Sequence, residues 1–110
     1  MLPRRLLLIV GGVKKYMVER YLPGMTTRGL DEASARLAAT ASELAAQGVG
    51  VRYMGSTFVP QEESCFCRFE ASSREIVQRI CEQARVPFAR IHTVRSFPSH
   101  VRRTEDTCAS

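Results

Sequence analysis

The sequence contains no tryptophan, and its aromatic residues are limited to three Tyr and five Phe among 110 residues. The hydrophobic core must therefore be built mainly from aliphatic side chains. The sequence also lacks an apolar run close to the ~18–20 residues of a transmembrane helix, because the run at 6–10 ends at a glycine pair. No convincing secretory cleavage site follows this run. The expected location is the cytoplasm, where thiols stay reduced.

Positive charge is in excess, with 16 Lys and Arg against 11 Asp and Glu. Residues 14–94 hold 11 basic and 9 acidic residues, a net of +2, and the two flanks hold 5 basic and 2 acidic residues, a net of +3. A nucleic-acid-binding domain carries its basic residues on the folded surface. The sequence therefore predicts no specific nucleic-acid partner and no membrane partner.

Motifs of common catalytic and metal-binding sites are absent from the sequence. The four cysteines include no C-x-x-C pair, and the shortest spacing is the C-x-C of Cys65 and Cys67. No glycine-rich loop opens a helix, and no motif places a nucleophile beside a base. The length of 110 residues is that of a single domain. These features favour a small non-catalytic module over an enzyme.

Hydrophobic periodicity and turn residues divide the chain into six elements. In order, these are a strand at 14–21, a helix at 28–47, strands at 49–59 and 64–71, a helix at 73–85 and a strand within 88–97. Thr27 is the expected N-cap of the first helix, and Ser72 with Glu75 forms a capping box for the second. This order predicts an α+β fold, the ferredoxin-like βαββαβ plait. Its antiparallel four-stranded sheet carries two helices on one face.

The ferredoxin-like domain is expected to span residues 14–97. Residues 1–13 are interpreted as a leader or a mis-called start outside the fold. Residues 98–110 are interpreted as a flexible tail that contains Cys108, to which no role is assigned. The expected core residues are Leu30, Leu37, Ala41, Leu44, Cys67, Phe69, Ile76, Ile80 and Ile91.

One sheet face is left without a helix in this fold. Alternation divides the first strand into two sets of residues on opposite faces: Tyr16, Val18 and Arg20, or Met17, Glu19 and Tyr21. Whichever set points away from the helices leaves apolar groups in water. Small plaits commonly cover this face with a second subunit, so we expect a homodimer.

Two segments resemble a family of small bacterial domains of unknown function, whose best-understood branch is described as nickel-binding ferredoxin-like proteins. The first segment is KYMVERYLPG at 15–24, and the second is SCFCRFEAS at 64–72. The helix at 76–84 and the Pro87 that follows it are also similar. The resemblance implies the same βαββαβ fold, usually dimeric. It implies metal binding only for the nickel branch.

The resemblance places Cys67 on the family's cysteine of the third strand. The nickel branch is richer in histidine near the second helix, where this sequence has Cys81. Val86 stands before Pro87, at a position where a histidine would suit a metal. These departures favour a thiolate-containing site, or none, over nickel coordination by nitrogen and oxygen ligands.

Cys67, Cys81 and His92 are the candidate metal ligands. From Cys67 the strand rises ~13 Å to its end, and the helix descends ~12 Å to Cys81, so the two thiols return to similar heights. A soft divalent metal, nickel or another, could bind between them, with His92 or a group of a second copy completing the shell. The alternatives are a metal-free module that binds a small molecule or acts as a scaffold, with two buried cysteines, and, ranked last, a dimeric α/β-barrel enzyme.

Overall fold

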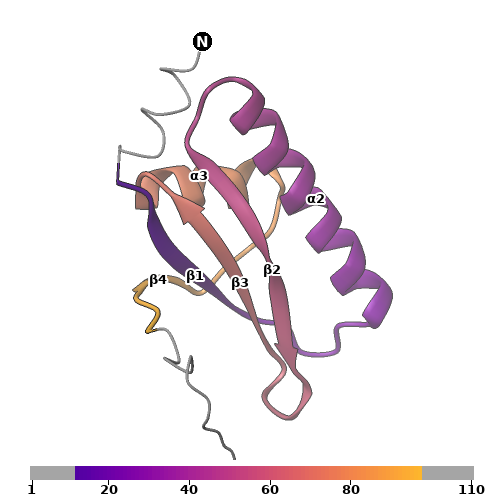
Figure 1. Cartoon of the computed structure of the whole chain (residues 1–110). Helices are drawn as coiled ribbons and strands as arrows, with labels where there is room; N and C mark the ends of the chain where they lie inside the picture. Colours follow the sequence, from indigo (N-terminus) through magenta and orange to yellow (C-terminus); the bar gives the residue numbers. More distant parts are fainter. Residues whose placement is uncertain (1–11, 98–110) are drawn as a thin grey trace, which may run out of the picture.

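The computed structural model describes residues 12–97 and shows the βαββαβ order (Figure 1). Its elements are β1 (Lys14–Tyr21), α2 (Thr27–Ala46), β2 (Val51–Val59), the 3-10 helix η1 (Pro60–Glu62), β3 (Ser64–Ala71), α3 (Arg74–Gln83) and β4 (Arg90–Val94). Apart from residues 12 and 13, the leader expected at 1–13 lies outside the described residues. The tail expected at 98–110 also lies outside them.

The four strands form one sheet in the order β2-β3-β1-β4, and every neighbouring pair is antiparallel. Strand β1 lies inside the sheet, where Val18 is paired with Cys67 on one side and with Ile91 on the other. Each helix connects two strands that are separated by one strand, which is the connectivity of the ferredoxin-like plait. The predicted α+β fold class is therefore confirmed. Strand β2 begins two residues later than expected, and β4 occupies only the middle of the predicted segment.

The core lies between the sheet and the two helices. Alternate residues of β1 and β3 point into it and meet one buried stripe from each helix. Its largest fully buried side chains are Val18, Leu37, Cys67, Phe69, Val77, Ile80 and Cys81. Two of the expected core residues, Leu30 and Ile76, are only partly buried. Each lies near the first turn of its helix, where the sheet does not fully cover the apolar stripe.

Both helices begin at a cap one residue away from the predicted one. Thr26, not Thr27, caps α2 and accepts a hydrogen bond from a first-turn amide at 3.0 Å. Ser73, not Ser72, caps α3, so Glu75 does not occupy the capping-box position. Neighbouring threonines or serines offer the same capping chemistry, which is why the sequence pattern did not distinguish them. Neither of these two described helices is long and apolar enough to cross a membrane.

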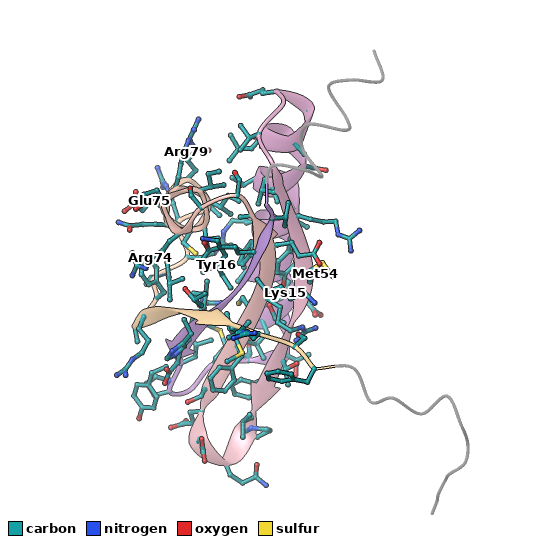
Figure 2. All side chains as sticks on the ribbon, turned by 60° about the vertical axis from the view of Figure 1, so that its left-hand side comes forward. Lys15, Tyr16, Met54, Arg74, Glu75 and Arg79 are labelled. Carbon is teal, nitrogen blue, oxygen red and sulfur yellow. The ribbon has the colours of Figure 1, made fainter. Side chains whose placement is uncertain are left out.

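The structure decides which set of β1 residues faces away from the helices. The residues buried beneath the helices are Tyr16, Val18 and Arg20. The residues on the opposite face, here called the open face, are Met17, Glu19 and Tyr21. Figure 2 shows the same alternation, with Tyr16 on the side of α3 and with Lys15 and Met54 on the other side.

Truncation of a fully buried helix side chain should destabilise the protein strongly. Leu37 and Ile80 are both 0% exposed. Leu37→Ala or Ile80→Ala should each cost ~2–5 kcal/mol in the free energy of unfolding, because each leaves a cavity. Ile76→Ala, at a partly buried position of the same helix as Ile80, is the matched control and should cost less. Urea unfolding measures all three, and a loss below ~0.5 kcal/mol for Leu37→Ala would contradict the packing.

Candidate functional site

The sheet separates the three candidate ligands. Cys67 of β3 and Cys81 of α3 face the core and are 0% and 1% exposed. His92 of β4 is paired with Met17, so it lies on the open face. The structure thus brings Cys67 and Cys81 into one layer but does not bring His92 to them. Within residues 12–97, no group of three or more His, Cys, Asp or Glu side chains is arranged to hold a metal ion.

A third cysteine belongs to the same layer as Cys67 and Cys81. Cys65 lies on the same face of β3 as Cys67 and is 2% exposed. Burial raises the pKa of the Cys65 thiol to about 11, and the neighbouring Cys67 thiol adds to this rise. Burial also raises the pKa of the Cys81 thiol to about 12, again with a contribution from Cys67. Cys65, Cys67 and Cys81 are called the thiol cluster below.

Arg20 brings a positive charge into the layer of the thiol cluster. Its side chain is only 3% exposed, and the residue is paired with Cys65 between β1 and β3. Its Nε donates a hydrogen bond to the carbonyl oxygen of Pro87 at 3.1 Å. The guanidinium lowers the pKa values of Cys65 and Cys81, but burial has the larger, opposite effect. These two thiols are therefore protonated at neutral pH.

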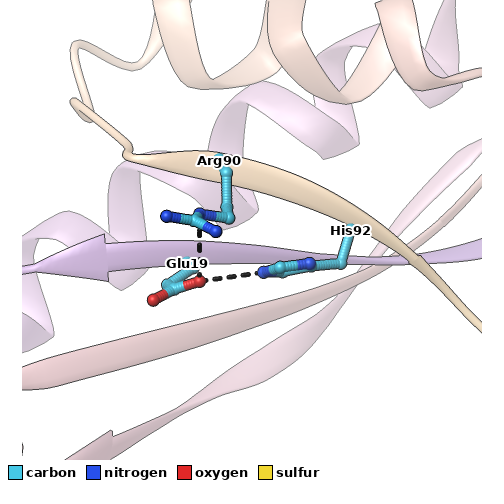
Figure 3. Close-up of polar contacts among 3 residues, drawn as sticks. All are labelled: Glu19, Arg90 and His92. Carbon is cyan, nitrogen blue, oxygen red and sulfur yellow. Dashed lines mark hydrogen bonds and ion pairs between the residues drawn. The ribbon is translucent and has the colours of Figure 1, made fainter.

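The open face carries a polar cluster of Glu19, Arg90 and His92 (Figure 3). Nε2 of His92 lies 2.8 Å from Oε1 of Glu19, and Nε of Arg90 lies 3.5 Å from the same oxygen. The antiparallel register of β1 and β4 places Glu19 directly opposite Arg90 and diagonal to His92. The side chains of Glu19 and His92 are 31% and 37% exposed, so both can reach a ligand from solvent.

The remainder of the open face mixes apolar and charged side chains. Met17, Phe66 and Val94 are half-buried, and Glu70 is paired with Arg52 at 3.7 Å. A groove of about 290 Å³ lies beside them, and its lining includes Lys15, Met17, Met54, Arg68 and Val94. A dimeric α/β-barrel enzyme would need its pocket between the sheet and the helices, whereas this groove lies on the open face.

Sequence reasoning missed two features of these clusters. It did not place Arg20 in the core, although Arg20 alternates with the apolar residues Tyr16 and Val18 and so shares their face. It also did not pair Glu19 with His92. That contact depends on the register between the first and last strands, which leaves no local signal in the sequence.

The plait, with helices over one face and the polar cluster on the other, defines a small ferredoxin-like domain. A family model described as "nickel responsive protein SCO4226-like" matches residues 16–94, and the chain belongs to this family. The resemblance noted from the sequence is thereby confirmed.

A solved structure supports the same fold. The crystal structure of SCO4226 from Streptomyces coelicolor A3(2) is similar, with a TM-score of 0.65 and 24% identity. The match covers 76% of this chain and 99% of that chain. At this identity, the likeness supports the fold alone. A comparison with curated proteins gives no match.

The thiol cluster should resist alkylation in the folded protein. Iodoacetamide reacts with thiolates, and burial both excludes the reagent and holds the pKa values of Cys65 and Cys81 at about 11 and 12. At neutral pH, native protein should therefore remain unmodified at both residues, whereas protein unfolded in urea is modified at both. Peptide mass spectrometry after a timed reaction reads each cysteine separately. Rapid labelling of native Cys81 would contradict the described burial.

Proposed function

We propose that this chain is a nickel-responsive module that works as a homodimer and holds a divalent nickel ion on the open face through His92 and Glu19. The observation that carries the proposal is the 2.8 Å contact between Nε2 of His92 and Oε1 of Glu19 on a solvent-accessible face. Membership of the nickel-responsive family supports the choice of metal.

The two donor atoms fit nickel in kind and in separation. Imidazole nitrogen and carboxylate oxygen are ligands that Ni(II) accepts, commonly in a square-planar arrangement. Two ligand atoms ~2.0–2.1 Å from a metal and at right angles to each other are roughly 2.9 Å apart. The observed 2.8 Å is the length of a hydrogen bond between the two atoms, and a bound ion would take the place of its proton. The Glu19 carboxylate would also offset part of the charge of the ion.

A second copy of the chain would complete the site. The cluster of one chain supplies two donors, whereas a square-planar ion takes four. Two copies packed with their open faces together would bring two Glu19–His92 pairs toward one interface. The same packing would cover the half-buried Met17, Phe66 and Val94. The unpaired face and the incomplete ligand set therefore support the same dimer.

Ligation by Cys67 and Cys81, the site favoured from the sequence, is the second candidate. The observation in its favour is that Cys67 lies close enough to Cys81 to raise the pKa of that thiol. The opposing observations are a thiol pKa of about 12 and side chains that are at most 1% exposed. A divalent ion would have to displace a tightly held proton in a closed layer. A metal-free scaffold or small-ligand module is the remaining alternative.

Nickel titration of matched variants separates these candidates. Glu19→Gln and His92→Gln should each weaken nickel binding by at least ~10-fold, because loss of even an outer-shell partner commonly costs ~10–100-fold. Glu70→Gln removes another open-face carboxylate and is the matched control, which should bind nickel as the wild type does. Cys67→Ser combined with Cys81→Ser should also leave nickel binding unchanged. Isothermal titration calorimetry measures each affinity.

Each result that would contradict the open-face site points to a different conclusion. Loss of nickel binding only in the double cysteine variant would move the site to the thiol cluster. Absence of nickel binding in the wild type would favour the metal-free module. Sedimentation with nickel present should give a mass near twice 12.3 kDa. A nickel-loaded monomer would contradict a site shared between copies.

Arg90 provides an independent test of the open-face site. Its Nε lies 3.5 Å from Glu19 Oε1, and its side chain is 67% exposed. A cation at this position competes with a metal ion for the same carboxylate, so Arg90→Gln should tighten nickel binding several-fold. Arg52→Gln, which removes the partner of Glu70 on the same face, is the matched control and should change the affinity less. Weaker binding in Arg90→Gln would contradict this competition.

A further inference from the structure

Arg20 is a buried cation for which the described chain provides little compensation. Its side chain is 3% exposed. Among residues 12–97, its one side-chain hydrogen bond is that from Nε to the Pro87 carbonyl oxygen, and no ion pair involves it. A buried charge is costly unless it is paired. The guanidinium is therefore placed to balance an anionic group that enters its layer.

The thiol cluster contains the acidic groups next to this cation. Cys65 is the direct cross-strand neighbour of Arg20. Cys67 lies two residues further along β3, on the same buried face. Arg20 also acts electrostatically on Cys81, which packs above the strand from α3. Because the thiols of Cys65 and Cys81 are protonated and neutral, they do not balance Arg20 in the metal-free protein.

We propose that Cys65 and Cys67 bind one copper(I) ion and that Arg20 supplies the counter-charge. When the ion binds, both thiol protons leave to solvent, and two thiolates with one monovalent ion carry one net negative charge. The guanidinium then brings the layer to neutrality. Two thiolates with a divalent ion would already be neutral, and the charge of Arg20 would remain unbalanced.

The surroundings of this pair also select a soft monovalent ion. Thiolate ligands favour copper(I), which is satisfied by two sulfur atoms in a linear arrangement. The site would need only two ligands, in keeping with the absence of a three-residue metal group among residues 12–97. Its neighbours in the sheet are apolar and buried: Val18 is paired with Cys67 across the strands, and Phe69 follows Cys67 on the same face of β3. Since both sulfur atoms are buried, the ion reaches them through local opening of the helix layer, and loading is slow.

This site is separate from the proposed nickel site, because it lies on the other face of the sheet and uses other residues. The test is an anaerobic titration of the full chain with copper(I) bound to bicinchoninate, whose absorbance reports the copper that the protein removes. We expect one copper(I) per chain. Cys65→Ala and Cys67→Ala should each lower the affinity by at least ~100-fold, since loss of an outer-shell partner alone reaches that size. Cys108→Ser is the matched control and should bind as the wild type does.

Arg20 variants test the counter-charge directly. Arg20→Lys should retain copper(I) binding, and Arg20→Met should lose most of it, with circular dichroism confirming that each variant is folded. His92→Gln should leave copper(I) binding unchanged, so failure of the nickel proposal and failure of this one are distinguishable. Copper(I) binding that survives in folded Cys65→Ala and Cys67→Ala, or that is lost only in Cys108→Ser, would overturn the proposal. Equal affinity in Arg20→Lys and Arg20→Met would remove the role of Arg20.

Discussion

The pairing of β1 with β3 on one side and β4 on the other is the constraint on which the rest of the structure depends. Because neighbouring residues of a strand point to opposite faces, this central strand places polar side chains both in the core and on the open face. The side chain of Arg20 lies in the core beside the thiols of β3. The side chain of Glu19 lies on the open face next to His92 of β4. Adjacent residues of one strand therefore belong to two side-chain clusters on opposite faces of the sheet.

The two proposed sites differ in solvent exposure, and this difference bears on the ions that would suit them. The Glu19–His92 pair is partly exposed and presents nitrogen and oxygen donors, which suit a divalent ion from solvent. The thiol cluster is closed, burial raises the pKa values of Cys65 and Cys81, and a guanidinium lies beside the cluster. The charge of Arg20 favours a monovalent ion over a divalent one, because two thiolates with a monovalent ion would keep one negative charge for the guanidinium to balance. We therefore propose the open face as the nickel site, although the cysteines are the more conspicuous feature of the sequence.

The fold was predictable because each of its elements has a local signal. The helix stripes at Leu37, Leu44 and Ile80 and the alternation of β1 and β3 are encoded within short segments, and their order leaves few topologies. Details that depend on a choice between chemically equal neighbours, such as Thr26 or Thr27 as a cap, were not predictable in this way. The candidate site was predictable only in part. Cys67 and Cys81 do meet in one layer, but the side of the sheet on which His92 lies depends on strand parity and register across 73 residues of sequence separation.

Residue-resolved NMR during a nickel titration tests the central claim, that nickel binding belongs to the open face, most directly. Imidazole nitrogen resonances report His92, and side-chain carbon resonances report Glu19 and the thiol cluster separately. The account predicts that nickel shifts or broadens the His92 Nε2 and Glu19 carboxyl signals first and leaves the β-carbon signals of Cys67 and Cys81 in place. Perturbation of the cysteine signals at low nickel, with His92 unaffected, would contradict it.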